Sequence, residues 1–140
     1  MIGIIDYGAG NLLSVKKALD YLHAETLIVQ SPQDFALIEK CILPGVGAFQ
    51  SAVLKLKEKG LFEPVREWLQ ENKPFLGICL GMQILFSESE EAPGMRGCAI
   101  FPGNVLQFTQ YKVPQIGWNQ VAFTRPSTIT EGISNNQYFY

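Results

Sequence analysis

One cysteine in this sequence is flanked in a way that suits a nucleophile. Cys79 stands at the centre of Gly77-Ile78-Cys79-Leu80-Gly81, between an apolar pair and the helix-like stretch Met82–Phe86. Glycines two residues before and after a nucleophile let a strand and the next helix approach closely, as in the elbow of serine hydrolases. The pattern predicts a strand, a tight turn with the thiol at its tip, and a helix whose first N–H groups favour the thiolate. A cysteine that is merely buried would not need both glycines.

Two features near Cys79 are candidates for holding a substrate. Gln83 lies one helical turn beyond Cys79 on the same face, where its carboxamide could contact a polar substrate, although an ordinary surface glutamine also fits. The loop Pro44-Gly45-Val46-Gly47 follows an apolar run, and loops after neighbouring strands of a doubly wound sheet meet at one edge. Its backbone N–H groups and that of Leu80 are therefore candidate donors to an oxyanion, with a plain turn as the alternative.

Two other features do not supply chemistry. A cysteine acyl-transfer enzyme needs a base, but His23, the one histidine, follows the first predicted helix. That helix carries it roughly 16 Å from the Cys79 edge, so we interpret it as a surface residue. The segment Gly8-Ala9-Gly10-Asn11 resembles the start of a dinucleotide fingerprint, but Leu13 replaces its third glycine and Asp6 would repel a phosphate. We therefore expect no cofactor.

Composition narrows the class of protein. The 140 residues are 47% hydrophobic, which suffices for one domain over residues 1–140 with a buried core. A net charge of -2 argues against nucleic acid or anionic membrane as a partner. Without a leader or an apolar run long enough to span a bilayer, we expect a soluble, cytoplasmic protein. Cys41, Cys79 and Cys98 lack metal-ligand spacing, so we expect neither zinc nor a disulfide framework, and Cys41 and Cys98 as buried thiols.

The apolar pattern alternates between strand and helix as far as Phe86. Non-alternating apolar runs predict four buried strands at Ile2–Ile5, Thr26–Val29, Cys41–Leu43 and Phe75–Ile78. Helical spacing predicts helices at Leu12–Leu22, with Asn11 as N-cap, and at Ala48–Lys59 and Leu61–Glu71. The alternation indicates right-handed βαβ units and a doubly wound, mostly parallel α/β sheet.

Beyond Phe86 the pattern changes. Ser87–Gly97 is polar and rich in turn formers. Five strand-like segments follow, at Cys98–Phe101, Asn104–Phe108, Val113–Trp118, Gln120–Phe123 and Gln137–Tyr140. Prolines and glycines interrupt them, which predicts mixed or antiparallel strands added to the parallel sheet after residue 97. Since the sequence stops within a run of strand formers, we expect a domain that is incomplete at its C-terminus.

Taken together, the motifs resemble the class I, triad-type glutamine amidotransferases, which implies their flavodoxin-like fold. The resemblance covers essentially the whole chain and rests on Ile4–Asn11, Leu43–Phe49, Lys73–Gln83 and Val113–Asn119. The Pro-Gly-Val-Gly loop and the Ile-Gly-Trp-Asn stretch are most similar to the glutaminase subunits of imidazole glycerol phosphate synthases, which act in histidine biosynthesis.

This resemblance implies a reaction and a place for each residue in it. Cys79 would attack the side-chain amide of L-glutamine and form a glutamyl thioester, releasing ammonia, and water would then free glutamate. Val46, Gly47 and Leu80 would supply oxyanion-loop amides, while Gln83 would contact the bound glutamine. The family implies no cofactor and no metal.

It also implies a partner. Ammonia would pass through a tunnel to a (βα)₈ cyclase subunit in a heterodimer, with Asn11, Trp118 and Asn119 toward the partner surface. A core tryptophan is the alternative for Trp118. The family's catalytic histidine and glutamate belong to a His-x-Glu motif in a C-terminal portion that these 140 residues do not contain. We therefore expect the chain alone to have at most trace glutaminase activity.

Three alternatives remain open. The chain could be a glutaminase that serves another synthase, such as a sugar-amination system. It could be a catalytically silent assembly module, which the missing base favours and the intact Cys79 opposes. It could also be a cysteine-elbow hydrolase or deglycase, although the Pro-Gly-Val-Gly loop fits that class poorly.

Overall fold

The structure, a computed structural model, describes residues 1–110 and 112–140. Contacts divide the chain into two compact units, Met1–Gln107 and Phe108–Tyr140, which are described separately below. The single domain that we expect over residues 1–140 therefore stays a prediction. Among the described residues, no helix is both long enough and apolar enough to span a membrane.

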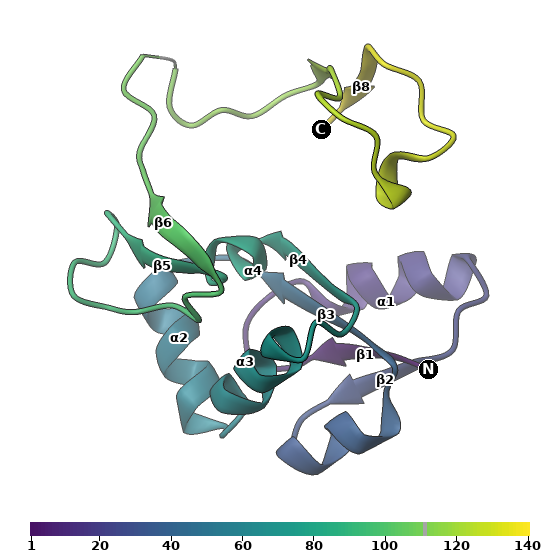
Figure 1. The fold of residues 1–140 in the computed structure, drawn as a ribbon, viewed down its shortest axis with the longest axis vertical. Coiled ribbons are helices and arrows are strands. Elements are labelled where there is room, and N and C mark those ends of the chain that lie inside the picture. Colours follow the sequence, from purple (N-terminus) through teal and green to yellow (C-terminus); the bar gives the residue numbers. More distant parts are fainter. Residues whose placement is uncertain (111) are drawn as a thin grey trace. The chain divides into compact units, whose positions relative to one another are not determined.

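The first unit is an α/β fold around a parallel sheet (Figure 1). Its elements in chain order are β1 (Ile2–Ile5), α1 (Leu12–Tyr21), β2 (Thr26–Val29), the 3-10 helix η1 (Pro32–Leu37), β3 (Lys40–Gly45), α2 (Phe49–Glu58), α3 (Phe62–Gln70), β4 (Phe75–Cys79), α4 (Leu80–Gln83), β5 (Phe86–Ser89) and β6 (Phe101–Val105). The four predicted parallel strands and the three longer predicted helices are thus confirmed, to within two residues at their ends.

The strand order β2-β1-β3-β4 determines where a site can form. From β1 the chain runs outward to β2 and then returns to the other side of β1 to form β3. Such a reversal separates the loops that follow the two inner strands and leaves a crevice at the carboxyl edge of the sheet. The parallel register continues to the end of β4, where Gly45 lies opposite Cys79. The loops after β1 and β3 and the end of β4 therefore share this edge.

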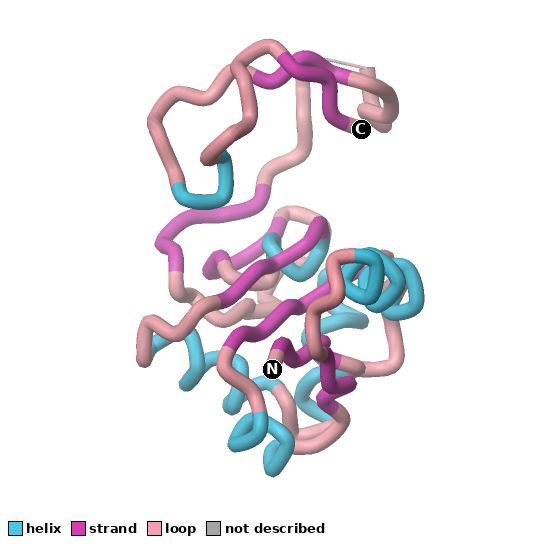
Figure 2. The backbone as a smooth tube through the Cα atoms, turned by 90° about the vertical axis from the view of Figure 1, so that its right-hand side faces the viewer, coloured by secondary structure: helices cyan, strands magenta, loops and turns pink. Residues whose placement is uncertain are grey.

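The larger hydrophobic core lies between the sheet and two helices. Because crossovers are right-handed, the reversal of strand order puts α2 and α3 on one face and α1 on the other, an arrangement visible in Figures 1 and 2. Alternate strand residues pack against α2 and α3; the fully buried members of this cluster include Ile5, Val29, Leu43, Val53, Leu56 and Val65. By contrast, α1 contributes no buried residue.

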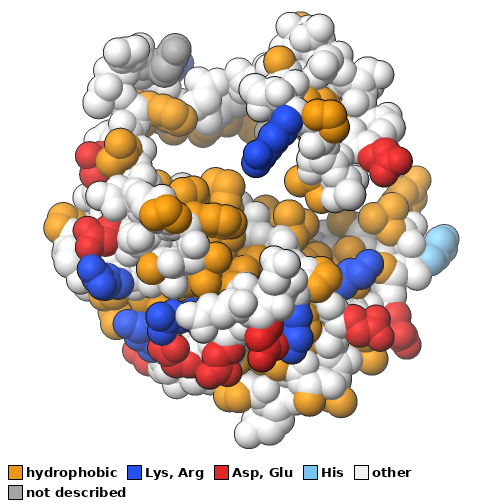
Figure 3. Space-filling model, in the orientation of Figure 1, with side chains coloured by type: hydrophobic (Ala, Val, Ile, Leu, Met, Phe, Trp, Pro, Cys, Tyr) orange, Lys and Arg blue, Asp and Glu red, His pale blue; other side chains and the backbone are white. Residues whose placement is uncertain are grey.

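The prediction that β4 is a buried strand is wrong, because the face of β4 opposite the α2–α3 core keeps apolar side chains in solvent. Leu76 and Ile78 point away from the α2–α3 core and are exposed, as is Met82 of α4. Figure 3 shows apolar side chains gathered on the face that carries these elements.

The segment after Cys79 differs from the sequence expectation. The predicted helix through Phe86 is wrong, because α4 ends at Gln83 and Phe86 begins β5. Main-chain contacts from a distant segment cause the difference: the Cys98 N–H donates to the Ile84 carbonyl at 2.7 Å, and β5 pairs with β6 from Phe86 onward. For α1, the predicted N-cap residue Asn11 stands at the N-cap position, but its side chain makes no capping hydrogen bond.

Strands follow residue 97 as expected, but their bounds and arrangement differ. Residues 98–100 form no strand, and the one strand β6 replaces the two predicted segments Cys98–Phe101 and Asn104–Phe108. β6 runs through Pro102 and Gly103, which we interpret from sequence as a break, and it pairs with β5 in parallel. In the second unit, β7 (Asn119–Val121) and β8 (Gln137–Phe139) are antiparallel, as predicted, whereas Val113–Trp118 forms no strand. Both pairs are separate two-stranded sheets and do not extend the parallel one.

Candidate active site

Cys79 occupies a sharp turn between a strand and a helix. It is the last residue of β4 and the residue before α4, and its backbone has φ 55° and ψ -115°. A residue with a Cβ seldom adopts such a conformation, and where it does the surrounding structure must hold it. The Cys79 thiol is free and the residue is exposed. The turn therefore presents the sulfur at the carboxyl edge of the sheet.

The two flanking glycines are required because backbone segments approach closely here. A Cβ on Gly81 would collide with the carbonyl oxygen of Leu43 on β3. A Cβ on Gly77 would lie 2.6 Å from the Cα of Met82, closer than real Cβ atoms come to any neighbour. The sequence interpretation of these glycines, that they let strand and helix approach, matches the observed contacts.

The loop after β3 lies beside this turn. Val46 and Gly47 directly follow Gly45, which is the register partner of Cys79. Val46 is 55% exposed, and Gly47 has φ 96°, which favours glycine. Leu80, the first residue of α4, is buried on the core side. The structure thus brings the proposed nucleophile and the proposed oxyanion residues to the same edge.

Gln83 faces a pocket that holds two unpredicted carboxylates. The pocket has a volume of about 370 Å³ and is lined by Gln83, Ser89, Glu90, Glu91, Val105, Leu106 and Gln107. Glu91 also accepts a hydrogen bond of 3.4 Å from the N–H of Phe49, at the start of α2. Glu91 therefore connects the pocket to the helix that follows the Val46–Gly47 loop. Sequence reasoning interprets this stretch only as polar turns, because nothing local signals the fold of β5 against β6.

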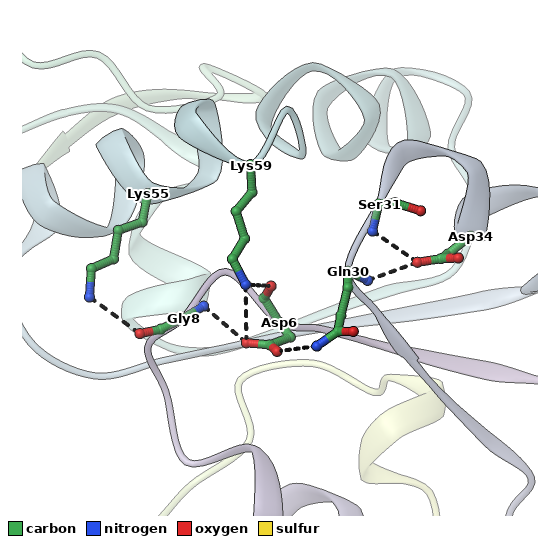
Figure 4. Close-up of polar contacts among 7 residues, drawn as sticks. All are labelled: Asp6, Gly8, Gln30, Ser31, Asp34, Lys55 and Lys59. Carbon is green, nitrogen blue, oxygen red and sulfur yellow. Dashed lines mark hydrogen bonds and ion pairs between the residues drawn. The ribbon is translucent and has the colours of Figure 1, made fainter.

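A polar network fixes the loop after β1 (Figure 4). The Asp6 carboxylate accepts hydrogen bonds of 2.9 Å from the Gly8 N–H and from the Gln30 side chain. Lys59 of the α2 C-terminus donates to the Asp6 carbonyl at 2.9 Å, and its ammonium lies 3.7 Å from the carboxylate. Lys55 of α2 donates to the Gly8 carbonyl at 3.2 Å. One helix therefore ties together the loops after β1 and β3.

This network stabilises the charged form of Asp6. The hydrogen bond from Gln30 lowers the pKa of the Asp6 carboxyl most, and the Gly8 N–H and the Lys59 ammonium act in the same direction against partial burial. The sequence analysis treats Asp6 only as a residue that would repel a phosphate. In the structure, Asp6 stabilises the loop after β1, at the edge of the sheet that carries Cys79.

The remaining predicted residues lie at both edges of the sheet and in the second unit. His23 is exposed and precedes β2, at the amino edge of the sheet, so it lies at the end opposite Cys79 as the sequence predicts. Asn11 is exposed in the loop after β1. Trp118 and Asn119 belong to the second unit, where Trp118 is 69% exposed and its ring contacts that of Tyr140.

The other two cysteines are structural. Cys41 and Cys98 are buried, and burial raises the pKa of each thiol to about 12. The predicted burial of both thiols is confirmed, and it leaves little thiolate to react at neutral pH. Among the described residues, no cluster of three histidine, cysteine or acidic side chains is arranged to hold a metal ion.

Known proteins are similar in sequence to this chain over its full length. The family model described as Glutamine amidotransferase class-I matches residues 3–140. Proteins named imidazole glycerol phosphate synthase subunit HisH are similar throughout: the Methanocaldococcus jannaschii protein is 48% identical over 100% of this chain and 70% of its own length. The Desulfitobacterium hafniense protein is 46% identical over 100% of this chain and 67% of its own length. The Chlorobaculum tepidum protein is 44% identical over 100% of this chain and 71% of its own length.

A solved structure shares the fold. A protein described as "Crystal structure of glutamine amidotransferase" superposes with a TM-score of 0.71 at 20% identity, covering 85% of this chain and 62% of that one. At this identity the likeness concerns the fold alone.

The strained turn predicts an unusual order of stability. Cys79→Gly and Cys79→Ala both remove the thiol, but only alanine keeps a Cβ at φ 55°. We expect the glycine variant to be more stable to urea unfolding by about 1 kcal/mol. At Ser51, an exposed position within α2, we expect the reverse order by a similar amount, since glycine weakens a helix. A more stable Cys79→Ala variant would contradict the strained conformation.

The Asp6 network predicts a dependence of stability on pH. Because the pKa of folded Asp6 lies below its ordinary value of 3.8, the carboxylate adds stability above that pH and loses it as pH falls through the folded value. We expect the wild type to exceed Asp6→Asn in unfolding free energy by about 1 kcal/mol at pH 7. The gap should close below about pH 3.8. A control, Glu58→Gln, removes an exposed α2 carboxylate and should show a smaller gap; an equal gap for both variants would refute the network.

Proposed function

Because this chain belongs to the class I glutamine amidotransferases, we propose that it is the glutamine-hydrolysing subunit of an imidazole glycerol phosphate synthase, acting in histidine biosynthesis. Identities of 44% to 48% over the full chain to proteins of that name support this choice within the family. The observation that carries the chemistry is the exposed Cys79 thiol in a left-handed turn, beside a glycine-containing loop.

The proposed reaction has two steps. The Cys79 thiolate attacks the side-chain amide carbon of L-glutamine; the S–C bond forms, the C–N bond breaks, and the nitrogen takes up a proton to leave as ammonia. Water then attacks the glutamyl thioester, which gives glutamate and regenerates the thiol. Backbone N–H groups of the Val46–Gly47 loop and of Leu80 stabilise the oxyanion of each tetrahedral intermediate. The protons are carried by the histidine of the family's His-x-Glu motif.

The pocket beside Gln83 suits the other end of the substrate. Free glutamine carries an α-ammonium group, which needs a carboxylate or other acceptors when it leaves water. Glu90 and Glu91 line this pocket together with the Gln83 carboxamide. We assign the α-ammonium to this acidic side of the pocket and the carboxamide contact to Gln83.

Ammonia is then used by a partner. We propose a (βα)₈ cyclase subunit in a heterodimer, with Asn11, Trp118 and Asn119 toward the partner. Exposed tryptophans are favoured anchors of protein interfaces, and Trp118 is the exposed one in the described part of the chain. The three cysteines of the chain are free thiols, which agrees with a reducing compartment. We therefore propose that the protein acts in the cytoplasm.

A glutamine-analogue electrophile tests the proposed pocket. The purified chain should be labelled on Cys79, as read by peptide mass spectrometry, and L-glutamine should slow the labelling. Cys79→Ala should abolish the adduct, whereas the matched control Cys41→Ala should keep it, because Cys41 is buried. In the same preparation, ammonia release from L-glutamine should be at most a trace, since His23 lies at the sheet edge opposite Cys79.

Two outcomes would contradict the proposal. Labelling of Cys79 that L-glutamine does not slow would mean that no glutamine pocket exists. Robust Cys79-dependent ammonia release from residues 1–140 would mean that the base lies within this chain.

A further inference from the structure

The Val46–Gly47 loop carries the candidate oxyanion donors, but little packs around it. Val46 is exposed, and a Cβ added to Gly47 would meet nothing within 4 Å. Within residues 1–110 and 112–140, neither backbone N–H of this pair donates to another main-chain group. Free N–H groups stabilise an oxyanion only if they point to the place where its charge develops. Their direction must therefore be set by the segments on either side of the loop.

The chain that leads into this loop lies between α4 and the loop after β1. On one side, a Cβ on Gly45 would lie 2.6 Å from the backbone nitrogen of Gly81 in α4. On the other side, a Cβ on Gly10 would lie 3.4 Å from the Pro44 carbonyl oxygen and 3.5 Å from its carbon. Gly10 has φ 100°, a conformation that favours glycine. The loop after β1 therefore lies against the peptide that precedes Val46.

Two ammonium groups of α2 hold the loop after β1 in place (Figure 4). Lys55 and Lys59 are one helical turn apart and lie on the same face of α2. Lys55 donates to the Gly8 carbonyl at 3.2 Å, and Lys59 donates to the Asp6 carbonyl at 2.9 Å. In the described part of the chain, these are the two side chains that donate to carbonyls of this loop. The position of the loop after β1 thus depends on α2.

We propose that Lys55 and Lys59 are positioning residues for the oxyanion donors. They hold the loop after β1 against Pro44, and this contact fixes the direction of the Val46 and Gly47 N–H groups. Because both ammonium groups bind backbone carbonyls of the loop after β1, they act on the donors through the two loops.

The consequence for catalysis rests on the proposed function, since an acyl transfer at Cys79 is what requires these donors. Preorganised N–H groups are effective because they need no reorganisation when the charge develops. A displacement of about 1 Å in a reacting site can lower a rate by about a hundredfold. Charge-assisted bonds from two lysines to the loop after β1 are stronger than neutral ones, so they suit the task of preventing such a displacement.

A chloroketone analogue of L-glutamine tests this arrangement on the purified chain. The Cys79 sulfur displaces chloride: the S–C bond forms, the C–Cl bond breaks, and the ketone oxygen lies where the oxyanion would form. Lys55→Met keeps the side-chain stem and removes the ammonium group. We expect its maximal labelling rate to fall about tenfold, because displaced donors polarise the ketone less, while the half-saturating concentration stays unchanged. Adding Lys59→Met should lower the maximal rate further.

Two controls separate positioning from a general effect. Iodoacetamide places no carbonyl in the oxyanion position, so it should alkylate Cys79 at the same rate in the wild type and in Lys55→Met. Lys57→Met removes a lysine of the same helix, whose ammonium lies 4.9 Å from the centre of the Phe62 ring. This variant should be labelled by the chloroketone as fast as the wild type.

The amide NMR signals of Val46 and Gly47 give a second readout, which needs no glutamine analogue. They should shift in Lys55→Met and keep their positions in Lys57→Met. Unmoved signals or a wild-type maximal rate in Lys55→Met would overturn the proposal. An equal fall in the iodoacetamide rate would also overturn it, because access to the sulfur would then have changed. Shifted signals in Lys55→Met, together with no saturable labelling of the wild type, would refute the proposed function and leave the positioning by the lysines in place.

Discussion

The geometry of the candidate site depends on one residue, Cys79, whose backbone is held in a conformation that L-amino acids rarely adopt. Cys79 keeps φ 55° because segments on both sides leave its chain no room to relax. On one side, β4 is locked to β3 as far as the pair Gly45 and Cys79. On the other, α4 lies so close to both strands that Gly77 and Gly81 tolerate no side chain. The exposure of the sulfur follows from this constraint.

Two kinds of interaction keep that edge in shape. The apolar cluster between the sheet and α2–α3 fixes the layers, and it extends up to Phe49 and Leu80 beneath the edge. Polar bonds then fix the loops: Lys55 and Lys59 of α2 hold the loop after β1, while Glu91 caps the start of the same helix. Because α2 follows the Val46–Gly47 loop, its position affects the backbone donors of that loop.

The sequence predicts those parts of the fold and the site whose signals come from residues close together in the chain. Buried parallel strands read as apolar runs, so Ile2–Ile5 and Thr26–Val29 are predicted with their observed bounds. The glycines of the elbow are also local signals, since their spacing reflects a steric need. The helix expected through Phe86 is wrong because its competitor, the pairing with Phe101, comes from a remote segment. The Asp6–Lys59 bond and the position of Glu91 also depend on segments that are far apart in the chain, so no local pattern in the sequence predicts them.

The central claim is that a strained turn presents the Cys79 sulfur while the fold shields the other two thiols. The direct measurement is the rate at which a small alkylating reagent modifies each cysteine of the native chain at neutral pH, compared with the rates in urea. The account predicts rapid modification of Cys79 under native conditions, with Cys41 and Cys98 reacting only once the chain unfolds. Protection of Cys79 in the native chain to the same degree as Cys41 would contradict it.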